Sequence, residues 1–290
     1  MGQGRVRQVG CYLRPAGLED AVAALADGRY TVLAGGTDVY PARVGRQPDD
    51  DILDITALAG LRGIEETSDA FRLGALTTWS DLLRAPLPPC FDALKQAARE
   101  VGGVQIQNAG TLCGNLCNAS PAADGVPPLL AMDAEVELAS RGGSRRLALD
   151  DFILGNRRTA KRADELVTAL HIPKPSTRAR SNFLKLGARK YLVISIVMVA
   201  TLVDLDEAGS IVTARVAVGS CAARAHRLPA VEAALAGQAF DADLLPRIGE
   251  EQLDPLSPID DLRGSAGYRR EAAVTLIRRS LEALLRQEGA

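Results

Sequence analysis

Residues 33–41 read LAGGTDVYP, and a second glycine-rich stretch at residues 108–124 reads NAGTLCGNLCNASPAAD. The first stretch directly follows a short β-rich run, and its successive glycines let several backbone N–H groups converge on one point, which makes a nest for phosphate oxygens. The absence of a Cβ atom also lets a diphosphate approach the main chain closely. A tight turn without a ligand explains Gly35-Gly36 equally well.

The second stretch offers complementary groups. Thr111 and Asn115 supply short hydrogen-bonding side chains, and the glycines beside them expose main-chain donors. Asp124 could accept a hydrogen bond from a ribose hydroxyl. Together the two stretches predict the walls of a diphosphate-and-ribose site, provided that the chain folds them onto each other.

Other nucleotide-binding and catalytic motifs do not occur in the sequence. Neither stretch matches GxGxxG or GxxxxGK[ST], which disfavours an NAD(P)-binding Rossmann domain and a P-loop nucleotidase. No nucleophile elbow is present, and His171 and His226 lie outside both stretches, which argues against hydrolase chemistry carried out by side chains. Any chemistry therefore falls to a cofactor, and we expect no catalytic residue.

The composition is that of an ordinary globular protein of about two domains. Hydrophobic residues make up 47% of the 290 residues and charged residues 24%, so the chain has the apolar surface that folding requires. The 34 Lys and Arg residues against 36 Asp and Glu residues give a net charge of −2, and aromatic residues are only 4%. Both values argue against a nucleic-acid binder.

Membrane, targeting and metal signals are also absent from the sequence pattern. The longest uncharged apolar run, residues 191–203, is shorter than the ~20 residues that a bilayer requires, and the N-terminus has no apolar signal core. We therefore expect no membrane insertion and a cytoplasmic location. The five cysteines are scattered, and Cys113 and Cys117 form CxxxC rather than the CxxC pairs of zinc or iron–sulfur sites, so we expect reduced thiols and no metal.

The hydrophobic pattern predicts an α+β chain. A helix over 18–26 and strands at 30–34 and 51–55 suggest a small parallel unit. Residues 101–118 show neither helical nor strand periodicity, and a long glycine-rich passage of this kind is more often functional than idle. Further predicted elements are a strand at 71–75, a capped helical turn at 77–83, a helix at 91–100 and a strand at 164–172.

Pro173-Lys174-Pro175-Ser176 has the composition of a domain boundary. After it the pattern predicts three strands, the last two joined by a hairpin turn at 206–210, and a C-terminal helix over 268–285. The three strands are predicted at 182–187, 195–204 and 211–218.

Three segments resemble the FAD-binding medium subunit of the molybdenum hydroxylases, a family that includes the flavoprotein subunits of aerobic carbon monoxide dehydrogenase and bacterial xanthine dehydrogenase-type enzymes. They read LAGGTDVYP (33–41), GVQIQNAGTLCGNLCNASPAADGVPPLLAMDAEVEL (103–138) and SPIDDLRGSAGYRREAAVTLIRRSL (257–281), and the resemblance runs over essentially the whole chain.

The resemblance implies an α+β fold of two domains. The first, over 1–175, is a two-lobed FAD-binding domain of the vanillyl-alcohol oxidase/para-cresol methylhydroxylase type, with lobes over about 1–60 and 61–175. The second, over 176–290, is a C-terminal flavoprotein domain with a three-stranded antiparallel sheet and helices.

The resemblance also implies which residues contact FAD. Residues 32–39 would wrap the diphosphate, and residues of the second lobe would hold its other side. Val101 and Gly102 match positions that approach the flavin in relatives, and Tyr191 matches a place beside the isoalloxazine, with core packing as the alternative. The implied cofactor-binding residues are Val32, Leu33, Ala34, Gly35, Gly36, Thr37, Asp38, Val39, Val101, Gly102, Thr111, Gly114, Asn115, Asp124, Val167, Lys185 and Tyr191.

One position departs from the family pattern. Relatives usually show Thr-Ile-Gly-Gly-Asn where this chain has Thr111-Leu112-Cys113-Gly114-Asn115. The Cys113 side chain either crowds the diphosphate or turns outward without effect. The chain also lacks the cysteine-rich insertion that gives 4-hydroxybenzoyl-CoA reductase an extra iron–sulfur cluster in this subunit, so the resemblance implies FAD and no metal here.

The implied function is electron relay in a heteromeric molybdenum hydroxylase. A large molybdenum-cofactor subunit oxidises the substrate, a small subunit passes electrons through [2Fe–2S] clusters, and FAD in this chain delivers them to NAD, oxygen, a quinone or another acceptor. A dimer of heterotrimers is common in the family. Two alternatives stay open: a flavin-free assembly or structural subunit of such a complex, and a stand-alone flavin oxidoreductase.

Overall fold

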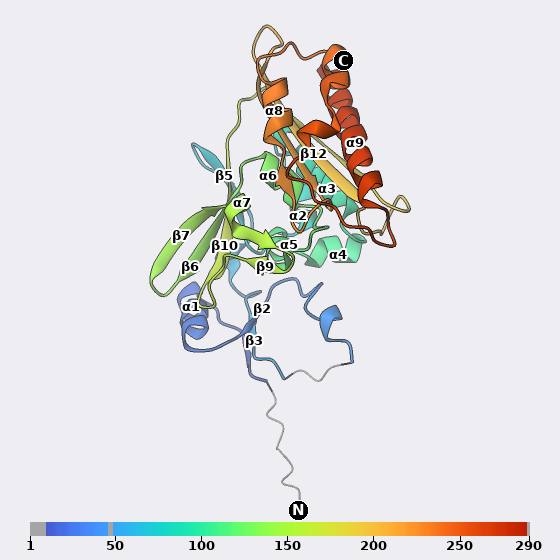
Figure 1. Cartoon of the computed structure of the whole chain (residues 1–290). Helices are drawn as coiled ribbons and strands as arrows, with labels where there is room; N and C mark the ends of the chain where they lie inside the picture. The colour runs from blue at the N-terminus through green and yellow to red at the C-terminus, as the bar shows by residue number, and fades with distance from the viewer. Residues whose placement is uncertain (1–9, 46–48, 289–290) are drawn as a thin grey trace, which may run out of the picture.

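The computed structural model describes residues 10–45 and 49–288 and shows an elongated molecule in which three sheets follow one another (Figure 1). A small parallel sheet lies at the N-terminal end and a five-stranded antiparallel sheet lies in the middle. A four-stranded antiparallel sheet lies with the longest helix at the other end. The α+β class is therefore confirmed.

The N-terminal lobe forms the small parallel unit that the sequence predicted. β1 (Tyr12–Leu13) and β2 (Thr31–Leu33) both pair in parallel with β3 (Ile52–Asp54), which lies between them. α1 (Leu18–Asp27) connects β1 to β2 and buries the apolar face that its helical spacing produces. The glycine stretch therefore begins where β2 ends, at the carboxyl edge of this sheet.

The second lobe is built on the antiparallel sheet of order β4-β5-β10-β6-β7. β10 is its central strand, and its apolar run is buried from Leu166 to Ile172. A separate two-stranded sheet pairs β8 with β9. The strands are β4 (Ile64–Glu66), β5 (Ala70–Gly74), β6 (Glu135–Ser140), β7 (Gly143–Ala148), β8 (Ile153–Gly155), β9 (Arg158–Thr159) and β10 (Leu166–Pro173). The helices are α2 (Trp79–Arg84), α3 (Asp92–Glu100), α4 (Val104–Ala109), α5 (Leu112–Asn118), α6 (Val126–Ala131) and α7 (Leu149–Phe152).

Residues 101–118 differ from the expectation of an irregular passage, because they contain the two short helices α4 and α5. Gly110 separates the helices, and Thr111 caps α5 by accepting a hydrogen bond from the Gly114 N–H at 3.0 Å. Helices of one to two turns are too short to show a clear period, and tertiary packing rather than propensity stabilises them. Leu112 and Leu116 of α5 provide that packing, since both are buried.

The C-terminal domain carries an antiparallel sheet of order β11-β12-β13-β14. β11 (Arg180–Leu186), β12 (Val197–Leu205) and β13 (Ile211–Gly219) are the three strands that the sequence predicted, and β14 (His226–Arg227) adds a fourth strand of only two residues. The β12–β13 turn has Gly209 in the left-handed region, with φ +79°. The helices are α8 (Pro229–Leu235) and α9 (Ala266–Glu288), and short 3-10 turns lie at Pro41–Arg43, Ala59–Leu61, Pro89–Phe91, Ala242–Arg247 and Glu250–Gln252.

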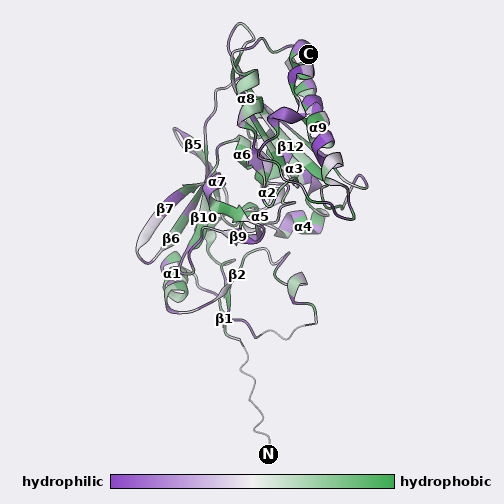
Figure 2. Ribbon diagram, in the orientation of Figure 1, coloured by the Kyte–Doolittle hydropathy of each residue, from purple (hydrophilic) through white to green (hydrophobic). Residues whose placement is uncertain are grey.

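The C-terminal sheet lies between two layers of helices. α9 packs on one face of β11 and β12, while α3 and α6 of the second lobe pack on the other face. One hydrophobic core therefore runs from the N-terminal lobe into β11–β13, and a second core lies between this sheet, α8 and α9. Figure 2 shows the hydrophobic residues gathered on the inner strands and hydrophilic residues along the outside of α9. No helix in the described ranges has the length and apolar character to cross a membrane.

Candidate cofactor-binding site

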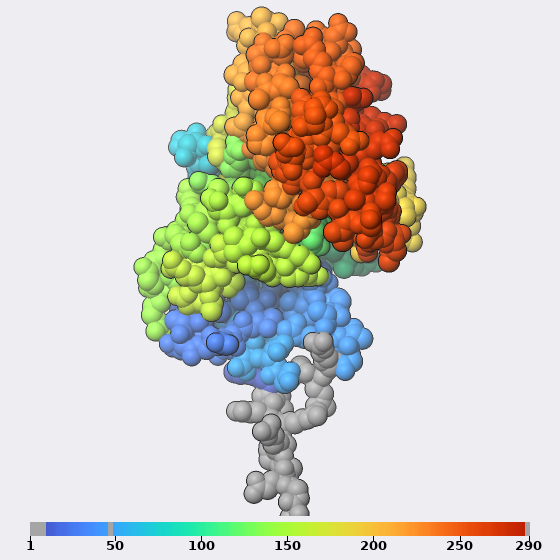
Figure 3. Space-filling model, in the orientation of Figure 1, coloured from blue at the N-terminus to red at the C-terminus, as the bar shows by residue number. Residues whose placement is uncertain are grey.

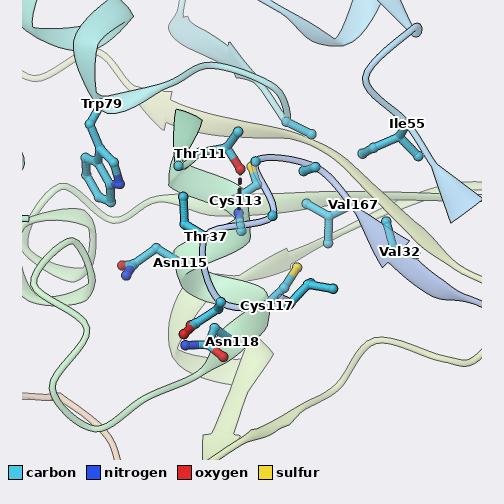
Figure 4. Close-up of a pocket in the computed structure, with 18 of the residues that line it drawn as sticks. Val32, Thr37, Ile55, Trp79, Thr111, Cys113, Asn115, Cys117, Asn118 and Val167 are labelled. Atoms are coloured by element: carbon cyan, nitrogen blue, oxygen red, sulfur yellow. Dashed lines mark hydrogen bonds between the residues drawn. The ribbon is translucent and has the colours of Figure 1, made fainter. Parts of the chain in front are cut away.

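A pocket of about 420 Å³ lies where the glycine stretch after β2 meets α5 and β10 (Figure 4). It brings together residues that are far apart in the sequence, from both lobes of the first domain. Twelve of the sequence-predicted residues line it: Val32, Ala34, Gly35, Gly36, Thr37, Asp38, Val39, Val101, Thr111, Gly114, Asn115 and Val167.

The two glycine-rich stretches touch each other, as a two-walled site requires. A Cβ atom on Gly35 would lie 2.0 Å from the Ala109 carbonyl oxygen and 2.9 Å from the Gly110 Cα. A Cβ atom on Gly110 would lie 3.4 Å from the Thr37 hydroxyl oxygen. Gly36 adopts φ +70°, a conformation that favours glycine. The close approach of these two backbones therefore depends on the absence of side chains.

The first stretch presents a series of free donors. Within the described ranges, the backbone N–H groups of Gly35, Gly36, Thr37 and Asp38 have no hydrogen-bond acceptor. Unpaired N–H groups are costly unless water or a ligand accepts from them. Successive N–H groups in such a loop form the concave, positively polarised surface that binds phosphate oxygens.

The opposite wall is the first turn of α5. Asn115 extends from this turn, and its Oδ1 atom is buried with no donor among the described residues. A buried acceptor without a donor is unfavourable, so a bound hydroxyl or N–H group would satisfy it. The free donors of one wall and the free acceptor of the other fit a ligand with a diphosphate and hydroxyl groups, such as FAD.

Cys113 does not fill the pocket, although it lies at its edge. The side chain is 3% exposed and belongs to the hydrophobic core beneath α5. Burial raises the pKa of its thiol well above the ordinary value, so the group is neutral. Cys117, one turn later, is exposed at the pocket, and desolvation by the surrounding protein raises the pKa of its thiol to about 11. Figure 4 shows both cysteines on α5.

Five predicted residues do not line the pocket. Leu33 is buried beside Gly36, and Gly102 lies behind Ile106 with φ +53°. Tyr191 is 60% exposed on the loop between β11 and β12, so the alternative of core packing does not apply to it. The remaining two, Asp124 and Lys185, form an ion pair with each other.

The Asp124–Lys185 pair joins the two domains behind the pocket. Lys185 Nζ lies 2.7 Å from Asp124 Oδ2 and 3.5 Å from the Glu100 carbonyl oxygen. The Ser195 hydroxyl donates to Asp124 Oδ1 at 2.7 Å. Burial raises the pKa of the Asp124 carboxyl, against the opposing effect of the Lys185 ammonium. Both oxygens of Asp124 are thus engaged by protein groups rather than free for a ribose.

The pocket also contains residues that the sequence analysis did not select. Trp79 packs its ring against Gly110 and Gly125, within 4 Å of where a Cβ atom on either glycine would stand. The sequence did point to Trp79, because it is the single tryptophan of the chain and directly follows the capping residue Thr78. Ile106, Cys117 and Asn118 belong to the quoted segment 103–138, but no feature of the sequence was a reason to select them. The others lie outside the quoted segments: Ile55, Ala75, Lys161 and Leu166.

The described ranges contain no group of three or more His, Cys, Asp or Glu side chains that could hold a metal ion. The titratable groups around the pocket are few, and they are engaged or neutral. Lys161, for example, donates to the Arg162 and Glu165 carbonyl oxygens, both at 3.0 Å. The arrangement is suited to holding a cofactor.

Comparison with known proteins supports this interpretation. Residues 5–175 match the family of the FAD binding domain in molybdopterin dehydrogenase, and residues 182–284 match the CO dehydrogenase flavoprotein C-terminal domain. The chain is 32% identical over 284 residues to the putative xanthine dehydrogenase FAD-binding subunit of Escherichia coli K12, covering 96% of this chain and 97% of that protein. It is 30% identical over 274 residues to the nicotine 6-hydroxylase medium subunit of Paenarthrobacter nicotinovorans, covering 93% and 95%.

A solved structure agrees over nearly the full length. One chain of carbon monoxide dehydrogenase from Hydrogenophaga pseudoflava, solved in a form that lacks the Mo-pyranopterin moiety, superposes on this chain with a TM-score of 0.84. The two chains are 27% identical in sequence, and the match covers 96% of this chain and 98% of that chain. The FAD-binding match spans more than half of this sequence, and the pocket has the donors and acceptor that FAD requires. The chain therefore belongs to the FAD-binding medium subunits of the molybdenum hydroxylases, the flavoprotein subunits of multi-subunit molybdenum-dependent oxidoreductases.

Proposed function

We propose that this pocket holds FAD and that the chain is the electron-transfer subunit of its complex. FAD would supply the chemistry, accepting electrons from the [2Fe–2S] clusters of a partner subunit and passing them to an acceptor such as NAD, oxygen or a quinone. The observation that carries the proposal is the convergence of four free backbone N–H groups, at residues 35–38, with the unpaired Asn115 Oδ1 in one pocket.

The two walls of the pocket would contact different parts of the cofactor. The N–H groups of residues 35–38 would donate to the diphosphate, and the absence of side chains at Gly35 and Gly110 leaves room for it. Asn115 would accept from a hydroxyl group of the cofactor. The flat ring systems of the cofactor would pack against aliphatic side chains, which favour such contacts. These side chains are Val32, Ile55, Leu166 and Val167.

The residues that do not line the pocket are proposed to act from behind it. The Lys185 ammonium lies next to the Glu100 carbonyl, one residue before the pocket residue Val101. Asp124 would hold this cation in place rather than bind a ribose. Gly102 would allow the chain to turn into α4, and Tyr191 would approach the flavin from the loop between β11 and β12.

The proposals on assembly and location rest on family membership and on the state of the cysteines. We propose that the partners are a large molybdenum-cofactor subunit and a small [2Fe–2S] subunit, arranged as a dimer of heterotrimers. We also propose a cytoplasmic location, because all five cysteines are free thiols, as a reducing compartment maintains them.

The first experiment is to purify the chain, record its visible spectrum and identify the released cofactor by chromatography. FAD in a ratio of one per chain is the expected result. Addition of the reduced [2Fe–2S] partner without oxygen should then bleach the flavin absorbance, while the isolated chain should leave the organic substrate unchanged. A colourless protein that does not take up FAD would favour a flavin-free assembly subunit, and substrate oxidation by the isolated chain would favour a stand-alone oxidoreductase.

A further inference from the structure

The two walls of the pocket are joined by an arginine that does not itself line the pocket. Arg157 Nη1 lies 3.8 Å from Asp38 Oδ2, and the same nitrogen donates to the Asn118 side-chain oxygen. Asp38 and Asn118 both line the pocket, the first on the glycine stretch after β2 and the second at the end of α5. The Arg157 side chain is 60% exposed, so this connection lies on the solvent side of the pocket. We call it the Arg157 bridge.

The Arg157 bridge is the second place at which the two walls meet. At the start of α5, Gly35 lies against the Ala109 backbone. The bridge joins the walls again at the end of α5, seven residues later, which at about 1.5 Å per residue is about 10 Å along the helix. In Figure 3 the yellow-green atoms around residue 150 lie against the blue atoms of the N-terminal lobe. A ligand held between the two connections is therefore enclosed while the bridge is in place.

The backbone of Arg157 is strained. Its φ is +56°, in the left-handed region that residues with a side chain seldom adopt. Its N–H donates to the Ala119 carbonyl oxygen at 2.9 Å, and Ala119, which follows the last residue of α5, is also left-handed, with φ +47°. The turn between β8 and β9 is thus fixed to the end of α5. A strained backbone that directs a charged side chain across a pocket points to a function for that side chain.

The charges around the pocket indicate a second effect of the Arg157 bridge. In the part of the chain that the structure describes, Asp38 and Lys161 are the charged residues that line the pocket. The Asp38 N–H is one of the four free donors proposed to bind the diphosphate, so its carboxylate belongs to the same residue as a proposed phosphate contact. Like charges this close repel each other. Arg157 neutralises the Asp38 carboxylate and leaves the Lys161 ammonium as the net charge that faces a diphosphate.

The exposure of the Arg157 bridge decides which property it affects. The Arg157 and Asp38 side chains are 60% and 58% exposed, and ion pairs between exposed groups contribute little to folding stability. Salt also screens such pairs. We therefore expect the bridge to affect the retention of a charged ligand rather than unfolding, and we expect that effect to depend on ionic strength.

We propose that Arg157 is a positioning residue for FAD, which encloses the cofactor by joining Asp38 to Asn118 and cancels the Asp38 charge beside the diphosphate. Release of FAD then requires the Arg157 bridge to open. The inference rests on the proposed function, because it concerns a cofactor with a diphosphate in this pocket. It adds the turn between β8 and β9 to a site otherwise built from the glycine stretch, α5 and β10.

The test measures how fast FAD leaves the purified, FAD-loaded chain. The chain is diluted into an excess of an unrelated flavin-binding apoprotein, and the transfer of FAD is followed by flavin fluorescence. The variant is Arg157→Asn, since asparagine tolerates a left-handed backbone and carries no charge. We expect it to release FAD about tenfold faster than wild type at low salt. The matched control is Arg158→Asn, at an exposed arginine for which the described structure shows no ion pair, and it should release FAD at the wild-type rate.

A salt series separates the charge of Arg157 from its shape. Between about 0.1 M and about 1 M salt the Debye length falls from about 10 Å to about 3 Å. Both the Arg157 bridge and the repulsion between Asp38 and the diphosphate are then screened, so the ratio of the two release rates should fall from about tenfold towards one. The double variant Asp38→Asn/Arg157→Asn has neither charge. It should release FAD more slowly than Arg157→Asn and should respond less to salt.

The other outcomes separate this inference from the proposed function. If the wild-type chain binds no FAD, the proposed function fails and the role of Arg157 fails with it. If wild type and Arg157→Asn release FAD at the same rate, the role of Arg157 is wrong while the proposed function stands. A rate ratio that does not change with salt, or equally fast release from Arg158→Asn, would mean that the substitution acts through the shape of the β8–β9 turn, and the inference is again wrong.

Discussion

At the level of single residues, the shape of the pocket depends on positions where no side chain can stand. Gly35→Ala would place a Cβ atom 2.0 Å from the Ala109 carbonyl oxygen, and a backbone atom cannot move away cheaply. We expect the two walls to separate and the FAD content of the purified protein to fall by about tenfold, which corresponds to 1.4 kcal/mol of binding. Gly60→Ala is the control, because nothing lies within 4 Å of its Cβ position. Unchanged FAD content in Gly35→Ala would contradict this account of the pocket.

We expect Cys113 to contribute to stability rather than to cofactor binding. Because the Cys113 thiol is buried in the core, Cys113→Gly should leave FAD content unchanged. It should lower the free energy of unfolding by about 2 kcal/mol, through the lost side chain and a glycine within a helix. Cys113→Ala separates the two effects, since it keeps the helix propensity. A gain of FAD in Cys113→Gly would show instead that the thiol crowds the cofactor.

Asp261 gives the C-terminal domain a specific response to acid. Its carboxylate accepts from the Arg263 backbone N–H and from the Arg269 and Arg263 side chains, which lowers its pKa from 3.8 to about 2. A depressed pKa in the folded state contributes stability that is present above about pH 4 and is lost as the pH falls to about 2.

Asp261→Asn should therefore unfold more readily than wild type at pH 7, and the difference should shrink between about pH 4 and pH 2. Chemical denaturation at a series of pH values measures this difference in the free energy of unfolding between variant and wild type. Asp243→Asn, at an exposed carboxylate for which the described structure shows no partner, should leave the curve unchanged. A difference that is constant with pH would mean that Asp261 acts through shape alone.

At the level of elements, α5 forms one wall of the pocket, and a cap on its first turn adds to the packing of its buried leucines. The Thr111 hydroxyl accepts from the Gly114 N–H at 3.0 Å, and the Thr111 backbone also bridges to Thr78 at the start of α2. Thr111→Ala should lower the free energy of unfolding by about 1 kcal/mol, the usual value of such a cap, and should weaken FAD retention. Thr111→Ser keeps the hydroxyl and should restore both. Equal losses in the two variants would show that the methyl group, not the cap, is what matters.

Comparison of the predicted and observed elements shows which parts of the fold and of the pocket the sequence alone could predict. The long strands and helices were predictable because their apolar residues form a continuous run, as in β12, or recur at helical spacing, as in α9. The glycine pair after β2 marked the first wall of the pocket. α4 and α5 were missed because helices of six and seven residues are stabilised by contacts made elsewhere in the fold. Ile55 and Lys161 belong to the pocket only through tertiary placement, which no local pattern encodes. Asp124 has the residue type expected of a ribose ligand, and only the fold shows it paired with Lys185.

At the level of the whole molecule, the two domains meet through a shared core, a buried ion pair and, nearer the surface, ion pairs that Asp133 and Asp150 make with arginines of the second domain. α3 and α6 of the first domain pack on β11 and β12 of the second, so the domain boundary in the sequence is not a boundary in the hydrophobic core. Asp124 in the first domain pairs with Lys185 and Ser195 in the second. The position of the pocket relative to the C-terminal domain therefore depends on this joint.

The last prediction concerns that joint. Lys185→Met would leave the Asp124 carboxylate buried without a counter-charge, and loss of one member of a buried pair costs about 3–5 kcal/mol. Since burial already raises the pKa of Asp124, this penalty should shrink as the pH is lowered and the carboxyl takes up a proton. The double variant Lys185→Met/Asp124→Asn should recover most of the stability, because it removes both charges. Urea unfolding of wild type, both single variants and the double variant, with FAD content recorded for each, gives the coupling energy. Additive losses would mean that the two charges do not support each other, and that the shared core and the remaining contacts across the joint hold the domains together.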